Sequence, residues 1–268
     1  REDMATAGVI VVGSVNVDLT ATGSPVPSAG ETRTGRDFAM GLGGKGANQA
    51  VAAARLGSQV TMVTRVGDDS FGGNVLRNLG DQGIDLTHAR VAEGMANGVA
   101  SIFVDPSGEN VIVIVAGANG TLSPADVDAA ADDLARCDLI LLSLGLAADR
   151  AVLREACAGA RAEGAVLVAS SPARGAMCWP AAYPGVIAAT GDARCGWDEL
   201  SLLPQCIVGA WCASPERGGR GMGGASLGAA RVAGHLAAHW PEARTDAAGW
   251  LAARAVHIGA EHRGTVPA

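Results

Sequence analysis

Short, almost wholly apolar runs recur along this chain, and they constrain its fold more than any other feature. One run spans 9–13, and three more span 139–144, 165–169 and 186–189. Runs of this length are typical of parallel strands that are buried on both faces. The segment from Asp149 to Glu163 lies between the second and third runs and has the length of a crossover helix. The sequence therefore predicts an α/β fold with a mostly parallel sheet between helices.

Length and charge exclude several classes of protein. A chain of 268 residues can form one large α/β domain or two smaller ones. No stretch approaches the roughly 20 uninterrupted apolar residues that a membrane-spanning helix needs. The charged segment REDMATAG before Val9 fits neither a signal peptide nor a transit peptide, so we expect a cytoplasmic location and no membrane partner. The formal net charge of -7 leaves no basic patch for nucleic acid.

The cysteines do not indicate a metal centre. All six lie after residue 136, and no C-x-x-C pair occurs. No histidine stands beside them at the spacing of zinc ligands. We therefore predict no metal site from the cysteines.

The sole lysine, Lys45, lies in the glycine-rich segment GLGGKGANQA, whereas every other basic residue is arginine. A retained ammonium indicates a requirement for a compact point charge, and the alternative is a leftover surface lysine. Gly43, Gly44 and Gly46 let the backbone approach a ligand closely and expose N–H groups. Residues 47–56 are predicted to form a helix, so these glycines would lie at its N-terminus, which favours oxygen-rich or anionic groups.

Asn16 and Asp18 follow the first apolar run. Ligands of open α/β sheets bind beyond the carboxyl ends of the strands, so both side chains are well placed for binding. An asparagine can donate and accept hydrogen bonds and an aspartate accepts them, which suits hydroxyl groups such as those of a sugar. An Asx turn after a strand is the structural alternative.

Four segments carry a family resemblance. They read VVGSVNVDLT, PSAGETRTGRDFAMGLGGKGANQAVAAARLG, VTRVGDDSFGGNVLRNLGDQGIDLTHA and GENVIVIVAGANGTLSP. In order and spacing they resemble the N-terminal half of ribokinase-type (PfkB) carbohydrate kinases, over about residues 9–142. The resemblance implies a three-layer α/β fold with a small β lid, formed by segments near 19–40 and 98–115. Alternating apolar residues at 99–105 and 111–115 predict lid strands there.

The resemblance also implies a sugar site and its partners. The positions that match the family's sugar contacts are Asn16, Asp18, Gly43, Gly44, Lys45 and Asn48, and those that match its apolar lid contacts are Ala100, Ile102 and Ile114. Apolar contacts of this kind cover a sugar and exclude water. The expected ligands are ribose or a related sugar, ATP and Mg²⁺. A homodimer through the β lid is also expected, because a small sheet otherwise presents open edges.

The sequence departs from the family pattern near Ser143. Gly145 stands where the family has a sugar-contacting glutamate. The family's N-x-x-E segment for the nucleotide is missing, and so is its late Gly-Ala-Gly-Asp turn, which carries the catalytic aspartate and the anion-binding N–H groups. Phosphoryl transfer depends on such positioning and charge stabilisation, so impaired catalysis is expected and no catalytic base is identified.

The remainder, about residues 143–256, resembles the C-terminal part of subtilisin-like serine proteases. The matching segments include WPAAYPGVIAATGDARCG and GMGGASLGAARVAGHLAAHWPEA. The protease nucleophile maps to Ser226, but the catalytic Asp and His of those enzymes come from a part that this chain has exchanged. Three interpretations of Ser226 stand open: a remnant nucleophile, a stand-in for the kinase base, and the N-cap of a helix over 227–239, which we favour. The turn 221–224 could bind an anion at that N-terminus.

Other polar residues of the second half have weaker patterns. Asp192 is a second candidate acid, but no glycine-rich helix entry follows it. His235 and His239 lie one helical turn apart, a spacing that suits a metal, although we favour a solvated helix face. Residues 194–224 lack periodicity and predict a long irregular loop, and 247–256 predict a last helix.

Two segments and three hypotheses follow. We expect a sugar-binding half with its lid over 1–142 and an atypical α/β continuation over 143–268. The first hypothesis is an ATP-dependent sugar kinase with impaired catalysis. The second is a non-catalytic sugar-binding chimera, and the third is a remnant serine protease.

Overall fold

The computed structural model describes residues 8–142, 145–212 and 224–260. The chain divides into two compact units, and each is assembled from separate segments. The first unit comprises Arg1–Val11, Gln49–Thr61 and Ala131–Ala268, and the second comprises Val12–Asn48 and Met62–Ala130. None of the described helices is both long and apolar enough to span a membrane.

The first unit is built on a mostly parallel sheet. Its strands are β1 (Gly8–Val12), β8 (Leu139–Leu142), β9 (Val166–Ser170), β10 (Ile187–Gly191), β11 (Leu200–Leu202), β12 (Val208–Ala210) and β13 (Ala255–Ile258). They lie in the order β13-β11-β12-β10-β9-β8-β1. Strands β8, β9, β10 and β12 are parallel to one another. Strand β11 is antiparallel to β12 and parallel to β13. The three apolar runs after residue 138 are therefore neighbouring parallel strands, as predicted.

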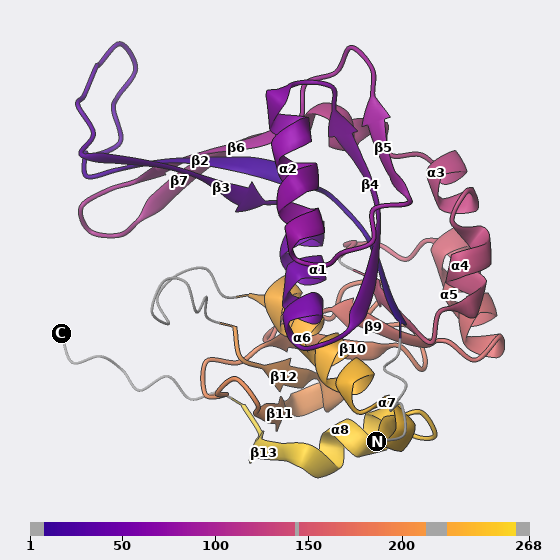
Figure 1. The fold of residues 1–268 in the computed structure, drawn as a ribbon. Coiled ribbons are helices and arrows are strands. Elements are labelled where there is room, and N and C mark those ends of the chain that lie inside the picture. The colour runs from indigo at the N-terminus through magenta and orange to yellow at the C-terminus, as the bar shows by residue number, and fades with distance from the viewer. Residues whose placement is uncertain (1–7, 143–144, 213–223, 261–268) are drawn as a thin grey trace, which may run out of the picture. The chain divides into compact units, whose positions relative to one another are not determined.

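Helices accompany this sheet. They are α4 (Ala131–Arg136), α5 (Ala151–Ala162), α6 (Ala225–Ala238), α7 (Trp240–Ala243) and α8 (Ala247–Arg254). Helix α6 packs against β8, β9, β10 and β12, and small residues along it permit a close approach (Figure 1). A β-carbon at Gly228 would collide with the backbone of Thr190, so this helix touches the end of β10 directly.

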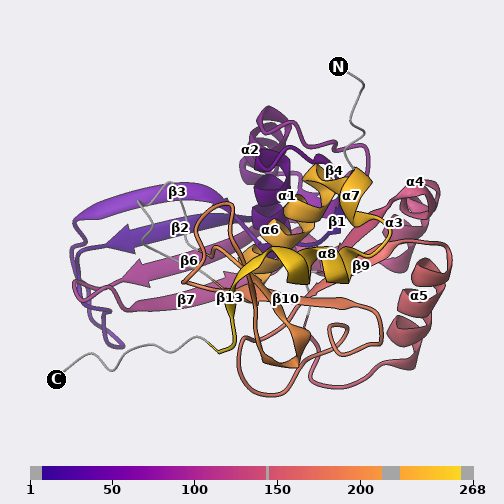
Figure 2. The same cartoon turned by 90° about the horizontal axis from the view of Figure 1, so that it is seen from below.

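The second unit contains a separate four-stranded sheet, here called the lid sheet. Its strands are β2 (Asn16–Thr22), β3 (Asp37–Gly43), β6 (Gly98–Val104) and β7 (Asn110–Val115). They lie side by side in the order β3-β2-β6-β7 (Figure 2). The central pair is parallel and both outer pairs are antiparallel. The predicted lid is confirmed.

The rest of the second unit supports the lid sheet's base. It includes the ends of α1 (Lys45–Arg55) and β4 (Gln59–Gly67), with β5 (Ala89–Ala92), α2 (Ser70–Asp81), the short 3₁₀ helix η1 (Gly117–Thr121) and α3 (Pro124–Asp128). Helix α2 begins where the Asp69 carboxylate accepts the Gly72 N–H at 2.8 Å. Arg65 on β4 pairs with the buried Asp126 of α3 at 2.7 Å. The Arg65 hydrogen bond lowers the pKa of Asp126 to about 2.

Two predictions about the second half are wrong in part. Residues 194–224 are not one irregular loop, because their described part contains β11, the 3₁₀ turn η2 (Pro204–Cys206) and β12. Strands of three residues are too short to give a periodic signal, and Leu200 and Val208 are nevertheless buried. The last helix ends at Arg254, and the chain continues directly as β13.

Candidate functional site

The predicted sugar-contacting residues of the lid sheet share one face. In the β-sheet register, Asn16 lies opposite Gly43, and Asp18 lies opposite Ala100. Ala100 in turn lies opposite Ile114 on the outer strand. Directly paired residues point to the same side of a sheet, as do residues two apart on one strand. We call this side the front face, and it carries Asn16, Asp18, Gly43, Ala100, Ile102 and Ile114.

The front face combines polar and apolar groups. Asn16 is buried and Asp18 is half-buried, both on β2 at the centre of the lid sheet. Beside them on β6, Ala100 and Ile102 are almost fully buried. Ile114 on the edge strand β7 is 65% exposed, so it offers an apolar surface rather than a packed core. An amide and a carboxylate next to aliphatic side chains can bind a molecule with both hydroxyl and C–H surfaces.

The Asp18 carboxylate occupies the space beside Gly43. An ideal β-carbon at position 43 would coincide with the carboxylate atoms of Asp18. Any side chain at position 43 would therefore displace the carboxylate. The sequence predicts that Gly43 lets the backbone approach a ligand. The structure adds a second reason for this glycine, because the Asp18 side chain needs the space.

The glycine-rich turn packs against the segment that carries Asn16. Gly44 has φ +91°, and a β-carbon there would meet Ser14 O and Asn16 N. A β-carbon at Gly46 would meet the backbone of Gly13. The Ala47 N–H donates to Ser14 O at 3.1 Å, which ties the start of α1 to this segment. The turn thus fixes where the ends of β2 and α1 lie relative to one another.

Lys45 and Asn48 lie on the first turn of α1 and are exposed. The helix begins at Lys45, two residues earlier than predicted. Neither side chain is packed in the core. With Gly43, Gly44, Asn16 and Asp18 they belong to the second unit, so the structure brings the predicted contacts into one unit.

Sequence reasoning missed Asn119, a residue of η1. Its side-chain amide donates to Asn16 Oδ1 at 2.8 Å and to Val15 O at 3.0 Å. It also accepts the Val15 N–H at 2.8 Å. In the sequence, Asn119 is marked only by its position in the segment GANG, and no pattern of polar residues there indicates a functional role.

The first unit holds the remaining candidates, and Ser226 is not the N-cap that we favoured. Helix α6 begins at Ala225 with Gly224 as its N-cap, so Ser226 lies inside the first turn. Its carbonyl accepts a hydrogen bond from Gln49 Nε2 at 3.2 Å. Within the described ranges, no histidine or carboxylate bonds to Ser226 Oγ. Residues 221–223 of the predicted anion-binding turn lie outside the described part of the chain.

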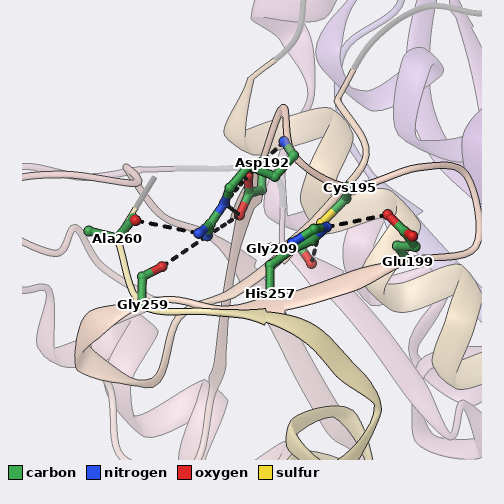
Figure 3. A network of polar contacts seen from close by, with 8 residues as sticks. Asp192, Cys195, Glu199, Gly209, His257, Gly259 and Ala260 are labelled. Carbon is green, nitrogen blue, oxygen red and sulfur yellow. Dashed lines mark hydrogen bonds and ion pairs between the residues drawn. The ribbon is translucent and has the colours of Figure 1, made fainter. Parts of the chain in front are cut away.

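Asp192 is engaged in a structural ion pair. Burial alone would raise its pKa, but the Arg194 guanidinium donates to both carboxylate oxygens and holds the pKa at about 2. Arg194 also donates to Gly259 O at 2.9 Å, beyond the end of β13. Figure 3 shows Asp192 in this network with Gly259 and Ala260. A carboxylate held so strongly in its charged form is a poor general base at neutral pH.

His235 does not lie on a solvated face, contrary to our interpretation. It is buried, because α6 is enclosed along most of its length, and burial lowers its pKa. His239 is the C-cap, and its Nδ1 lies 3.0 Å from His235 O. No group of three or more His, Cys, Asp or Glu among the described residues could hold a metal ion.

Gly145 stands where a sugar-contacting glutamate was expected. A β-carbon at this position would lie 3.0 Å from Cys178 Sγ, which is closer than nearly all real contacts. A larger side chain there would require Cys178 to move.

Comparison with known proteins identifies relatives of the chain. A model of the pfkB family of carbohydrate kinases matches residues 6–189. The deoxyribokinase of Salmonella typhi is 49% identical over 136 residues, which make up 51% of this chain and 44% of that protein. The ribokinase of Mus musculus is 44% identical over 138 residues, 52% of this chain and 43% of that protein. The matched part therefore spans less than half the length of these relatives.

Solved structures share the fold. The structure of ribokinase from Giardia lamblia has a TM-score of 0.54 and 34% identity, and covers 61% of this chain and 54% of its own. That of Arabidopsis thaliana ribokinase complexed with ribose and ATP has a TM-score of 0.51 and 28% identity, and covers 62% and 53%. The α/β fold is therefore ribokinase-like, a central mostly parallel sheet with helices and a small separate lid sheet.

The family match corrects the extent of the resemblance. It continues to residue 189, through β8, β9 and part of β10, and so passes the change predicted near Ser143. Nothing in these comparisons supports a subtilisin-like part.

Proposed function

This chain belongs to the pfkB family of carbohydrate kinases, and from that premise we propose that it binds ribose or a closely related pentose for phosphorylation by ATP. The relatives named above are ribokinases and a deoxyribokinase, which supports a pentose as the ligand. The observation that carries the proposal is the front face, where Asn16 and Asp18 stand beside Ala100 and Ile102.

The front-face residues have distinct roles in this proposal. Asp18 accepts hydrogen bonds from sugar hydroxyls, and Asn16 and Lys45 donate to hydroxyl oxygens. Ala100, Ile102 and Ile114 cover the C–H surface of the sugar and exclude water from it. Gly43 and Gly44 leave room for the Asp18 carboxylate and for close approach of the turn. Together these groups orient one hydroxyl toward a phosphoryl donor.

ATP and Mg²⁺ are included in this proposal only because the chain belongs to the family. ATP would supply the phosphoryl group and Mg²⁺ would neutralise charge on it. The described residues do not fit a metal-binding cluster, and Asp192 is held in its ion pair. Phosphoryl transfer therefore stands on the family and on the names of the relatives, whereas sugar binding also has support from the geometry of the front face.

A second candidate function is sugar binding without phosphoryl transfer. The observation that favours it is Gly145, because the family's glutamate is missing there and even a β-carbon at this position would lie 3.0 Å from Cys178 Sγ. In this case the second unit still recognises the sugar, since all the proposed contacts lie within it.

Calorimetric titration and a turnover assay on one sample separate the two functions. The protein is titrated with D-ribose and 2-deoxy-D-ribose, then with a non-hydrolysable ATP analogue and Mg²⁺, and ADP release is followed in a coupled assay. Sugar binding with sugar-dependent ADP release supports the kinase. Sugar binding without nucleotide binding supports the second candidate, and no sugar binding refutes both.

We also propose a homodimer through the opposite side of the lid sheet, here called the back face. Its residues are apolar and largely exposed: Phe38, Met40, Phe103, Val111, Val113 and Val115. A contiguous exposed apolar surface of this kind is typical of a protein interface. A second copy of the chain would bury this surface.

A further inference from the structure

The Asn119 side chain makes three hydrogen bonds at the base of the lid sheet. Its Oδ1 accepts the Val15 N–H at 2.8 Å, and its Nδ2 donates to Val15 O at 3.0 Å. The second hydrogen of Nδ2 is directed to Asn16 Oδ1 at 2.8 Å. All three bonds join residues more than 100 positions apart in the sequence, so they depend on the folded second unit.

The backbone of Val15 settles which way both amides point. A backbone N–H only donates and a carbonyl oxygen only accepts, so the oxygen of Asn119 must face Val15 N and its nitrogen must face Val15 O. The Asn119 nitrogen then has one hydrogen left, and the atom of Asn16 that faces it must be an acceptor. Asn16 therefore turns its oxygen toward Asn119 and directs its Nδ2 elsewhere. No described residue accepts a hydrogen bond from Asn16 Nδ2.

Glycines make room for this pair of amides. Gly98 lies opposite Asn16 in the β2–β6 register, and a β-carbon there would collide with Asn119 Nδ2 and Asn16 Oδ1. Gly117, at φ +50°, starts the turn that carries Asn119, and a β-carbon there would meet Ala96 O. The Ala118 N–H donates to the same carbonyl at 2.8 Å. The turn is thus tightly held where it presents Asn119.

We propose that Asn119 is a positioning residue that fixes Asn16 as a hydrogen-bond donor to a hydroxyl oxygen of the bound sugar. This inference rests on the proposed function. It assigns complementary roles to two neighbours on the front face: Asn16 donates and Asp18 accepts. Asn119 lies behind Asn16 and acts through it, without touching the ligand.

Hydrogen exchange in the ligand-free protein tests the orientation without any sugar. With ¹⁵N-labelled asparagine, the NH₂ hydrogens of Asn119 should exchange slowly with solvent, because both are in hydrogen bonds. Those of Asn16 should exchange much faster. Substitutions Asn16→Asp and Asn119→Asp assign the two signals. Protected hydrogens on Asn16 with exposed ones on Asn119 would overturn the inference.

Two isosteric variants test the donor role in binding. Asn16→Asp keeps an acceptor for Asn119 but removes the donor, so it should lose at least tenfold in ribose affinity, as much as Asn16→Ala. If Asn16→Asp bound ribose as well as the unsubstituted protein, Asn16 would serve as an acceptor and the inference would be wrong. Asp18→Asn is the matched control. It replaces a carboxylate oxygen, which should accept a hydrogen bond from the sugar, with an NH₂ group that can only donate.

A sugar series tests the action of Asn119 through Asn16. The probes are D-ribose and analogues that each lack one hydroxyl. In the unsubstituted protein, removal of the hydroxyl that Asn16 contacts should lower the affinity for the sugar. In Asn119→Ala, removal of the same hydroxyl should lower the affinity less than twofold. The penalty at the other hydroxyls should stay unchanged, and Asn119→Ala should add less than twofold to the loss caused by Asn16→Ala.

A structural role alone gives a different pattern. Asn119→Ala would then weaken all the sugars equally, and its effect would multiply with that of Asn16→Ala, which would overturn the inference. Failure of the proposed function is separate, because it appears as no binding of any sugar to the unsubstituted protein. The exchange measurement on that protein does not depend on whether the variants fold.

Discussion

The carboxylate of Asp18 lies where a β-carbon at Gly43 would be, so these two residues of neighbouring lid strands share one small volume. Asp18 can hold its place on the front face only while position 43 has no side chain. The relationship joins two separate predictions of the sequence, an acceptor after the first strand and a glycine before α1. Gly43 is therefore needed because it has no side chain, and not because its backbone is flexible.

Gly43→Ala should weaken ribose binding at least tenfold, because the added methyl group displaces the Asp18 carboxylate from its hydrogen-bonding position. Calorimetric titration measures the loss. Gly41→Ala is the control, since Gly41 lies on the same strand and a β-carbon there meets nothing within 4 Å. Equal losses in both variants would show that the strand, and not the contact with Asp18, is responsible.

Lys45→Ala should lower ribose affinity by roughly 10- to 100-fold, through loss of a charge-assisted hydrogen bond of about 1.5 to 3 kcal/mol. Lys45 is exposed, so the thermal midpoint should change little. Lys45→Arg keeps the charge but not the compact ammonium, and it should restore only part of the affinity. Full affinity in Lys45→Ala would remove this residue from the site.

Val113→Asp should convert a dimer to a monomer, because it places a charge among the exposed apolar side chains of the back face. Light scattering across a concentration series measures the mass. Val152→Asp is the matched control: Val152 is an even more exposed valine on α5 of the first unit. An unsubstituted protein that stays monomeric at high concentration would contradict the proposed interface.

Asp192→Asn should destabilise the protein by roughly 3 kcal/mol at pH 7, since Arg194 would lose its buried charge partner. The pKa of Asp192 in the folded protein, about 2, lies below its ordinary value of 3.8. The ion pair therefore stabilises fully above about pH 4, and its contribution is lost as the pH falls through about 2.

Urea unfolding at pH 7, 4, 3 and 2 tests this dependence. The difference between the unsubstituted protein and Asp192→Asn should shrink across the acid range. Asp133→Asn, which breaks an exposed pair with Arg136, should cause little change at any pH. If the difference in unfolding free energy between the two proteins stayed constant down to pH 2, the charge of the Asp192 carboxylate would not be the cause of the stabilisation.

Local patterns in the sequence predicted the features that depend on periodicity. The apolar runs after residue 138 are neighbouring parallel strands, and alternation at 99–105 and 111–115 predicted the strands β6 and β7. That these strands belong to a lid was implied by the family resemblance. Period-two alternation also explains why residues of four strands reach one face. The positions of Asn16, Asp18 and Ala100 follow from this rule together with the family resemblance.

What the sequence could not give depends on contacts between distant segments. Asn119 matters through Asn16, which is 103 positions away, and no local pattern marks such a pair. His235 was misplaced because the apolar character of α6 extends around the helix, so a polar residue on it is buried. Serine is favoured at an N-cap, so the sequence predicts Ser226 there, but glycine is also accepted and Gly224 occupies that position.

A single lysine gives the protein a single ε-amino group, and that amine stands on the exposed first turn of α1 next to the turn that holds Asn16. Amine-selective acylating reagents therefore address one side-chain amine. A fluorophore attached through it would lie at the start of α1, which is hydrogen-bonded to the segment before Asn16, and its emission would respond to nearby changes in solvent. The same scarcity that marks Lys45 in the sequence makes it a built-in attachment point for an optical probe.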